Sequence, residues 1–338
     1  MTFTRRDFFA TAAISSACAA IGSRADAEPQ PSSATPDHGQ DHASHNHPKP
    51  VRPTVPKLPV VLCKVTGTVG IDAAYTMLKQ GRDTLEAALN VTTAQEDDPD
   101  DHSNGLGGLP NEDGEVQLDA CCLHGPTRRG AAVAAVSGIR NAALLARAVM
   151  ELTDYPLLAG SDAQRFALAQ GFAKQDLVTE QSRLFWAVWK EICASPEPLG
   201  PLIYDPLWPE PLRKAHFLSA SQKDLDMLVH RFERVAAKLG IGPQWTWRAT
   251  YEALFPAAEP LYVATANDEQ QISSAATTSG LPWRLGGATS DIAMLGAGCY
   301  LDPEVGSAGS SGQGAANIRG GAGFSDAPIS ERDCCKFR

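Results

Sequence analysis

The chain has 338 residues, of which 43% are apolar, and its formal net charge at pH 7 is −10. This length is enough for one large domain or two small ones, and the apolar share is enough to bury a sizeable core. The acidic balance argues against a general nucleic-acid binder, which would present a basic face.

The first residues have the pattern of an export signal. Arg5 and Arg6 precede an apolar stretch over 8–21, and the small-x-small tripeptide at 25–27 offers a cleavage site. Paired arginines before a short apolar run are typical of twin-arginine signals, and this run is too short to span a membrane in the mature protein. We therefore predict a signal over 1–27, export to the periplasm, and no membrane association once the signal is removed.

Residues 28–57 are rich in Pro, Ser, Asp and His and poor in apolar side chains, which predicts a disordered linker. Half of the chain's eight histidines lie in this segment: His38, His42, His45 and His47. Such a tract can capture Zn²⁺ or Cu²⁺. A flexible segment loses conformational entropy when it orders around a metal, so we favour a solvated linker and predict neither a metal site nor a cofactor.

The cysteine pattern indicates packing rather than a framework of disulfides. Of the eight cysteines, Cys18 lies in the predicted signal and seven remain, an odd number. Their spacings match neither a zinc site nor a dense disulfide scaffold. Cys121 and Cys122 lie in an apolar run with the pattern of a strand, so we interpret them as packing residues.

From residue 58 onward, strand and helix patterns follow one another. Strands are expected over 58–65, in a run that ends near Leu123, and over 261–268 and 271–280, with a hairpin turn at Asn267-Asp268. Helices are expected over 70–81, 83–98, 128–153 with a break near Gly138 or Asn141, 161–172, 179–193 and 224–240. Residues 196–220 contain many prolines and predict a long surface connection. The order of elements indicates an α/β or a layered α+β domain.

The helix predicted over 179–193 has an aromatic face. Phe185, Trp189 and the apolar stem of Lys190 lie close to one another at helical spacing, as on a buried face. We interpret Trp186 and Trp189 as core or interface residues rather than as part of a cofactor site.

Two long motifs carry a family resemblance. EDDPDDHSNGLGGLPNEDGEVQLDAC, at 96–121, resembles a stretch early in the first subunit of glycosylasparaginases. TTSGLPWRLGGATSDIAMLGAGCYLDPEVGSAGSSGQG, at 277–314, resembles the region after the nucleophile of these enzymes. The resemblance covers roughly 58–320, and two long motifs in the right order are far more specific than a lone glycine motif.

The resemblance implies an α+β fold, the four-layer αββα sandwich of N-terminal nucleophile hydrolases. Members of this family are made as one chain that cuts itself just before a threonine. That threonine then hydrolyses the amide bond between asparagine and N-acetylglucosamine, and relatives act on asparagine or isoaspartyl peptides. Threonine suits this role because its hydroxyl is the nucleophile and its freed α-amine is the base, while a pair of donors stabilises the oxyanion.

The resemblance places the family's cut near 259–260, where it usually reads His-Asp-Thr. Counting back without a gap from Thr277-Thr278-Ser279-Gly280 puts Ala258, Glu259 and Pro260 at those three positions. Pro260 therefore occupies the nucleophile position. Proline has no hydroxyl and no backbone N–H, and its ring fixes φ, so neither self-cleavage nor acyl transfer can begin there.

The other family positions match in part. Thr278 matches the threonine that orients the nucleophile, and Asp291 matches the aspartate that pairs with the substrate's α-amine. Ser311 matches the threonine on the oxyanion side and is followed by Gly312. Ala288 stands where an arginine usually grips the α-carboxylate, so the bidentate clamp is absent. A tryptophan that the family carries in its first strand region is also missing around 63–67.

The last residues, 321–338, depart from the family. After GQGAANIR the family continues with a helix and further strands, whereas this chain continues with GGAGFSDAPISERDCCKFR, which has no clear periodicity. We expect a truncated or frame-shifted C-terminus. The loss of the last strands would leave exposed sheet edges.

Three functions are compatible with these residues. The first is an asparaginase-type pseudoenzyme that stays uncut and inactive because of Pro260. The second is an active hydrolase whose nucleophile is displaced to Thr265 or Thr250. The third is a non-catalytic periplasmic binding protein in which Asp291, Ser311 and Gly312 hold an amino acid. The expected partner is a small asparagine derivative rather than nucleic acid or membrane, and the resemblance also implies a homodimer.

Overall fold

The structure is a computed structural model. It describes residues 58–64, 69–194, 222–254, 256, 260–310, 314–321, 323 and 335–337. The predicted signal and linker, with their histidines, and the connection over 196–220 lie outside the described residues. Within the described ranges, every helix is either too short or too polar to cross a membrane.

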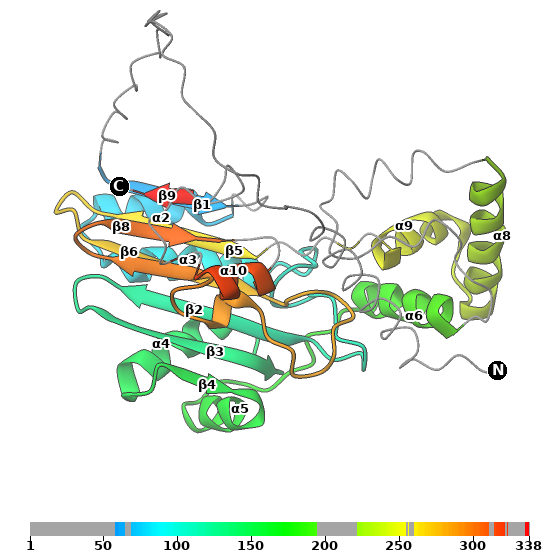
Figure 1. The fold of residues 1–338 in the computed structure, drawn as a ribbon, viewed down its shortest axis with the longest axis horizontal. Helices are drawn as coiled ribbons and strands as arrows, with labels where there is room; N and C mark the ends of the chain where they lie inside the picture. Colours follow the sequence, from blue (N-terminus) through cyan, green and yellow to red (C-terminus); the bar gives the residue numbers. More distant parts are fainter. Residues whose placement is uncertain are drawn as a thin grey trace, which may run out of the picture. The chain divides into compact units, whose positions relative to one another are not determined.

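A six-stranded sheet forms the centre of the fold (Figure 1). Its strands are β1 (Val60–Lys64), β2 (Gln117–His124), β3 (Arg129–Ser137), β4 (Leu157–Ala159), β5 (Leu261–Ala266) and β6 (Ile272–Thr278). They lie in the order β1-β5-β6-β2-β3-β4, and all neighbours are antiparallel except β3 and β4. The strands expected over 58–65, up to Leu123, 261–268 and 271–280 are thereby confirmed, and the β5–β6 turn lies at the predicted Asn267-Asp268.

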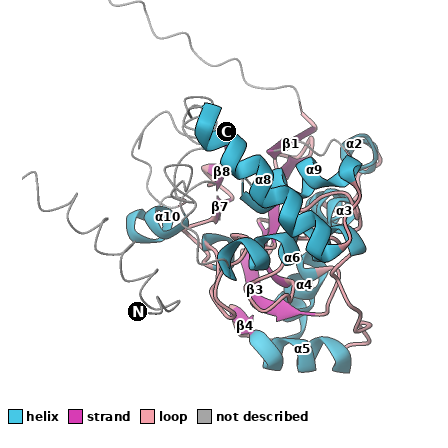
Figure 2. Ribbon diagram, turned by 90° about the vertical axis from the view of Figure 1, so that its right-hand side faces the viewer, coloured by secondary structure: helices cyan, strands magenta, loops and turns pink. Residues whose placement is uncertain are grey.

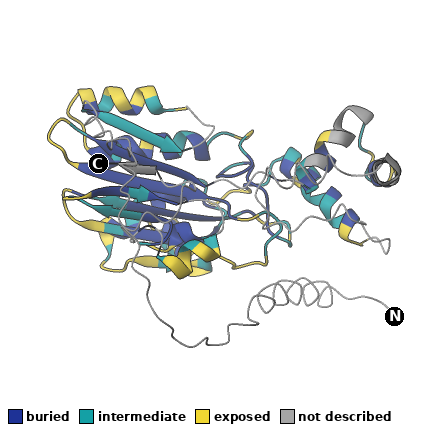
Figure 3. Cartoon of the chain, turned by 45° about the horizontal axis from the view of Figure 1, so that its top comes forward, coloured by how far each residue is buried: buried dark blue, intermediate teal, exposed yellow. Residues whose placement is uncertain are grey.

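Helices pack on one face of this sheet and build the main core. They are α2 (Ile71–Lys79), α3 (Thr84–Glu96), α4 (Ala142–Leu152) and α5 (Gly160–Ala169). The Asp83 side chain caps α3 by accepting a hydrogen bond from the backbone N–H of Glu86 at 3.0 Å. Buried side chains from α3 and α4, such as Leu89 and Leu145, meet the alternate residues of the strands that point the same way. Figure 3 shows this burial on the strands.

The prediction of a helix over 128–153 is wrong in its first half. Residues 129–137 form β3, and only α4 is helical. Alanine has a high intrinsic helix propensity. Here, however, the segment pairs with β2 along its length, and its residues are buried on both faces of the sheet. Arg128, with φ 53°, and Ala135, with φ 48°, mark the turn before β3 and an irregularity within it. The predicted break near Gly138 is the boundary between strand and helix.

A second sheet stacks on the other face of the large sheet. It contains β7 (Cys299–Asp302), β8 (Gly306–Gly309) and β9 (Cys335–Phe337), paired antiparallel in that order. The two sheets approach closely at Gly309, where an added Cβ would lie 2.2 Å from the Tyr262 ring. The unperiodic tail thus contributes a strand that covers β8, a pairing that the sequence pattern did not predict.

The layers agree with the α+β class expected from the resemblance. In Figure 2, α2, α3 and α4 lie to the right of the large sheet, and β7 and β8 lie to its left. The short helix α10 (Gly314–Gly320) follows on that side and contacts the 3₁₀ turn η2 (Asp291–Ala293). One outer layer of the sandwich therefore consists of several helices. In the described part of the chain, the other outer layer consists of α10.

Three further helices share a separate core. They are α6 (Glu180–Ala194), α8 (Gln222–Leu239) and α9 (Pro243–Leu254), and α9 was not predicted from the sequence. Phe185 is fully buried in this core, and the Trp189 ring stacks on Trp283 with centroids 5.3 Å apart. The indole N–H of Trp186 donates to the Glu112 carbonyl at 3.3 Å. The packing role predicted for Trp186 and Trp189 is thereby confirmed.

Candidate active site

Three residues lie in one row across the large sheet, namely Pro260 directly before β5, Thr278 of β6 and Asp119 of β2. Leu261 of β5 pairs with Thr277 of β6, so Pro260 stands opposite Thr278 one position further along. On the other side of β6, Thr278 pairs with Asp119 of β2. The order β5-β6-β2 is visible in Figure 1. The row thus joins the position expected for the nucleophile to that of the orienting threonine.

The side chains of this row face the second sheet. Successive residues of a strand point to opposite faces. Thr277 points to the helices, where its hydroxyl donates to Glu96 of α3, so Thr278 points the other way. Pro260 and Thr278 are both buried. The space between the sheets is therefore where chemistry at this row would take place.

Pro260 contributes neither of the two groups that a terminal threonine would. Its side chain is a saturated ring without a hydroxyl, and its nitrogen carries no proton within the chain. The neighbouring Ala258 and Glu259 lie outside the described residues.

The Thr278 hydroxyl is hydrogen-bonded to the turn that follows it. Its Oγ1 accepts a hydrogen bond from the backbone N–H of Gly280 at 3.0 Å. Gly280 has φ 72°, in the region that favours glycine, and an added Cβ would lie 1.8 Å from an Arg284 nitrogen. The backbone N–H of Ser279 also donates to the Ser103 carbonyl at 2.8 Å. The glycine is therefore required by both the backbone and the guanidinium packed against it.

A buried ion pair holds the loop after β6 against β2. Asp119 is fully buried, and its Oδ2 lies 3.0 Å from an Arg284 nitrogen. The same oxygen accepts from the Ser290 N–H at 2.7 Å, and Oδ1 accepts from the Ala135 N–H at 2.7 Å. Arg284 donates as well to the Gln117 carbonyl at 2.8 Å. This pair was not predicted from the sequence, although an aspartate inside the apolar run of β2 is a signal of a buried partner.

Asp291 lies at the start of η2, in a buried position beside α10. Its Oδ2 accepts hydrogen bonds from the Ser310 hydroxyl at 3.0 Å and from the Asn317 amide at 2.7 Å. Its Oδ1 faces Gly314, where an added Cβ would lie 3.0 Å away. A carboxylate expected to receive an ammonium group therefore already has partners from the chain.

The remaining expected positions lie apart from this row or outside the described residues. Ala288 is exposed on the loop before η2 and has no charged group to offer. Arg284 lies four residues earlier and is committed to Asp119. Ser311 and Gly312 lie outside the described residues, as does most of the segment 63–67.

The two displaced candidates for a nucleophile lie in packed surroundings. Thr265 is fully buried in β5, and its hydroxyl donates to the Thr84 carbonyl of α3 at 2.7 Å. It therefore faces the helices rather than the space beside Thr278. Thr250 is buried in α9.

The most perturbed carboxyl group near this row is Glu96, on the helix-facing side. Burial raises its pKa from 4.5 to about 7. Its Oε1 accepts from the Thr277 hydroxyl at 2.7 Å and from the Ala143 N–H, at the start of α4, at 3.0 Å. Glu96 is the first residue of the motif at 96–121, and no role was predicted for it from the sequence. Its contacts identify it as a junction between α3, α4 and β6.

Two cavities in the described part of the chain lie away from this row. One lies beside β7 and α10, and neither is lined by Pro260, Thr278 or Asp291. The described residues also contain no cluster of three His, Cys, Asp or Glu side chains suited to a metal. The site therefore keeps the scaffold of the row but lacks the hydroxyl and amine that would begin acyl transfer at Pro260.

Comparisons with known proteins show which proteins the chain resembles. Residues 64–197 match the model of the family described as Asparaginase. The chain is 28% identical over 270 residues to an N(4)-(Beta-N-acetylglucosaminyl)-L-asparaginase of Elizabethkingia miricola, covering 79% of this chain and 63% of that protein. It is 27% identical over 253 residues to the mouse protein of the same name, covering 73% and 65%. A putative Drosophila melanogaster protein of this name is 29% identical over 266 residues, covering 78% and 63%. The chain thus spans less than two thirds of the length of these curated relatives.

Proposed function

Because the chain belongs to the glycosylasparaginase-type asparaginase family, we propose that it is a pseudoenzyme of that family, which folds without self-cleavage and does not hydrolyse asparagine amides. The relatives are named for the hydrolysis of N4-(β-N-acetylglucosaminyl)-L-asparagine, and this is the reaction that we propose the chain has lost. Pro260 carries the proposal, because it stands opposite Thr278 where the nucleophilic hydroxyl is expected.

The surrounding residues support this proposal. Ala288 provides no carboxylate clamp, and the Asp291 carboxylate already accepts two hydrogen bonds from the chain. The alternative of a displaced nucleophile is less well supported, because Thr265 lies in the helix-facing core with its hydroxyl engaged. A substrate could reach it only if α3 separated from β5.

The test is the state of the purified protein without residues 1–27. We expect a single uncut chain by intact mass and on a denaturing gel, and no release of aspartate from N4-(β-N-acetylglucosaminyl)-L-asparagine. Two fragments in the unmodified protein would contradict the proposal, and the new N-terminal residue would identify the true nucleophile.

A matched pair of variants isolates the hydroxyl. Pro260→Thr restores it, whereas Pro260→Val supplies a side chain of the same shape without it. We expect cleavage before residue 260 in the threonine variant alone, slowly, because Ala258 and Glu259 replace the usual His-Asp. Equal cleavage in both variants would show that the hydroxyl at this position is not the missing part.

We also propose that the protein is exported by the twin-arginine route. The support is the pair Arg5-Arg6 before the apolar stretch. Replacing both arginines with lysine keeps the charge and is expected to retain the protein in the cytoplasm of a bacterial host. Unchanged export of that variant would exclude the route.

A further inference from the structure

Two cysteines from facing sheets meet in the layer between them. Cys121 belongs to β2 of the large sheet and Cys299 to β7 of the second sheet. Both are fully buried and belong to one contact cluster. Several other members of this cluster are alanines, namely Ala132, Ala264 and Ala276. Small side chains allow the two sheets to approach closely at this point.

The approach is closer than usual for stacked sheets. Stacked sheets typically lie about 10 Å apart, whereas β2 and β7 include residues whose Cα atoms lie within 8 Å of each other. A disulfide requires Cα atoms roughly 4.4–6.8 Å apart. Some residues of the two strands are therefore close to the Cα separation that a disulfide requires.

The position of Cys299 over the large sheet is fixed by a third residue. Its Sγ lies 3.4 Å from the Ser274 hydroxyl of β6. In the β2–β6 register Cys121 pairs with Ala276, so Ser274 is its diagonal neighbour on the same face. Cys299 thus lies above the strip between Ser274 and Cys121, in the same contact cluster as Cys121.

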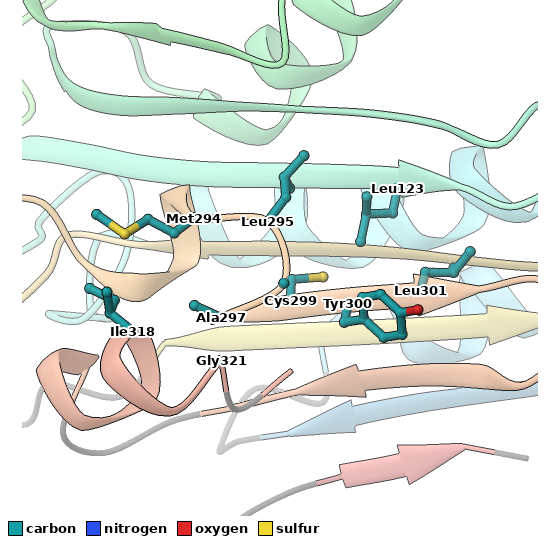
Figure 4. A pocket seen from close by; sticks show the side chains of 10 residues that line it. Leu123, Met294, Leu295, Ala297, Cys299, Tyr300, Leu301, Ile318 and Gly321 are labelled. Atoms are coloured by element: carbon teal, nitrogen blue, oxygen red, sulfur yellow. The ribbon is translucent and has the colours of Figure 1, made fainter. Parts of the chain in front are cut away.

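One of the two cysteines lines a cavity, although its side chain is buried. A cavity of about 580 Å³ is lined by Cys299 together with apolar side chains that include Leu123, Leu295, Tyr300 and Ile318. Figure 4 shows Cys299 between Ala297 and Tyr300, with Leu123 opposite. Cys121 does not line this cavity, so a small apolar reagent would meet Cys299 first.

We propose that Cys121 and Cys299 are a redox-active pair that closes to a disulfide between the two sheets, with Cys299 as the sulfur that receives the oxidant from the cavity. The oxidant class is a small apolar disulfide. This pair is separate from the row of Pro260 and Thr278, so the inference does not depend on whether the chain hydrolyses an amide.

The reaction is two successive thiol–disulfide exchanges. The Cys299 thiolate attacks one sulfur of the oxidant, which forms a mixed disulfide and releases one thiolate. The Cys121 thiolate then attacks the Cys299 sulfur, which forms the internal disulfide and releases the second thiol. The protein loses two hydrogen atoms, and the oxidant is reduced to two thiols.

The surroundings predict that closure is slow at neutral pH. The neighbouring Cys299 thiol and burial raise the pKa of the Cys121 thiol well above its ordinary value, which lowers the fraction of thiolate. The rate of the second exchange should therefore rise with pH, and the mixed disulfide on Cys299 should be detectable before closure.

Cys122 is a matched control within the same strand. It is equally buried but belongs to the main core on the opposite face, next to the helices. Burial raises its pKa to about 12. A pairing driven only by the presence of cysteine in β2 would treat Cys121 and Cys122 alike, whereas the proposed geometry selects Cys121.

The experiment treats reduced protein lacking residues 1–27 with 2,2′-dithiodipyridine, then blocks remaining thiols with N-ethylmaleimide after denaturation and maps the peptides by mass spectrometry. We expect a Cys121–Cys299 link in the unmodified protein and in Cys122→Ala. In Cys121→Ala we expect the pyridine mixed disulfide to remain on Cys299. Closure of this long loop should raise the midpoint of thermal unfolding by about 5 °C.

Three outcomes would overturn the proposal. One is a link from Cys299 to Cys122, Cys334 or Cys335. Another is a stable pyridine adduct on Cys299 of the unmodified protein with Cys121 still free to react with N-ethylmaleimide. The third is loss of the link in Cys122→Ala while that variant remains folded. The peptide map of the unmodified protein decides the question even if Cys121→Ala fails to fold.

Discussion

The two faces of β6 hold adjacent threonines in contrasting surroundings. Thr277 faces the helices, and its hydroxyl donates to the buried carboxyl group of Glu96. Thr278 faces the second sheet and stands opposite Pro260, which has no polar group to offer it. The helix-facing side thus keeps a hydrogen-bonded polar junction, whereas on the other side the threonine expected to orient the nucleophile faces a proline.

The difference is the one that the proposed pseudoenzyme predicts, in which contacts that hold the fold remain while the nucleophile is absent. Polar groups that hold backbone segments together are present, such as Asp119 with Arg284 and Glu96 with Thr277. Two positions that the resemblance assigns to the reaction or to the substrate are replaced, Pro260 and Ala288, whereas Thr278 and Asp291 are kept. The buried contacts of Asp119 and Glu96 therefore predict effects on stability.

The largest change in stability is expected when the buried ion pair on the side that faces the second sheet is broken. Asp119→Ala would leave the buried Arg284 charge and the N–H groups of Ala135 and Ser290 without their acceptor. Removing one partner of a buried, hydrogen-bonded ion pair typically costs about 3–5 kcal/mol. We expect a loss of about 4 kcal/mol in the free energy of unfolding, measured by urea denaturation.

Two variants control for this effect. Arg82→Ala breaks an exposed pair with Glu86 on the same domain and is expected to cost less than about 0.5 kcal/mol. Asp119→Leu combined with Arg284→Met removes both charges and should destabilise less than Asp119→Ala alone. If Asp119→Ala cost no more than Arg82→Ala, the pair would not hold the loop.

On the helix-facing side, Glu96 predicts a pH dependence of stability. Its folded pKa of about 7 lies above its ordinary value of 4.5, so the folded state binds the proton more tightly. The stabilising contribution is fully present below pH 4.5 and is lost as the pH rises through about 7. A shift of this size corresponds to about 3 kcal/mol.

Glu96→Gln isolates this contribution from those of other titrating groups. The amide keeps an acceptor for Thr277 and Ala143 but does not ionise. We expect the unfolding free energy of the unmodified protein, relative to that of the variant, to fall by about 3 kcal/mol between pH 4.5 and pH 8. A difference that does not change with pH would show that Glu96 stays ionised or solvated in the folded state.

The sequence predicted what depends on local pattern or on the family motif. The β5–β6 hairpin was predicted from its strand pattern and its Asn267-Asp268 turn. The gapless count from Thr277-Thr278-Ser279-Gly280 assigned Pro260 to the nucleophile position, and the β5–β6 register sets Pro260 opposite Thr278. Both inferences use residues that lie close together in the chain, where the strand period leaves little freedom in register.

The features that were not predicted depend on contacts between residues that lie far apart in the sequence. Alanines at 131–135 favour a helix by propensity, and only the partner strand β2 makes them a strand. The Asp119–Arg284 pair joins residues on separate motifs, and the Asn317 amide reaches Asp291 from α10. Such pairings are set by the stacking of layers, which no local pattern contains.

The smallest expected effect concerns the site itself. If the site-facing side has lost its chemistry, millimolar asparagine should not raise the midpoint of thermal unfolding of the unmodified protein. A ligand at a concentration equal to its Kd stabilises by only about 0.4 kcal/mol, or about 1–2 °C for a domain of this size. Replicate melts must therefore resolve a shift of this size.

Ala288→Arg sharpens this test, because it returns a cation to the position where the family grips the α-carboxylate, and Ala288→Gln is the uncharged control. We expect asparagine to shift the midpoint for the arginine variant alone, by about 1–2 °C. Asp291 would have to exchange a hydrogen bond from Ser310 or Asn317 for the ligand's ammonium group, which limits the gain. A shift in the unmodified protein would instead favour a binding protein, because the retained Asp291 would then hold the ligand without the clamp.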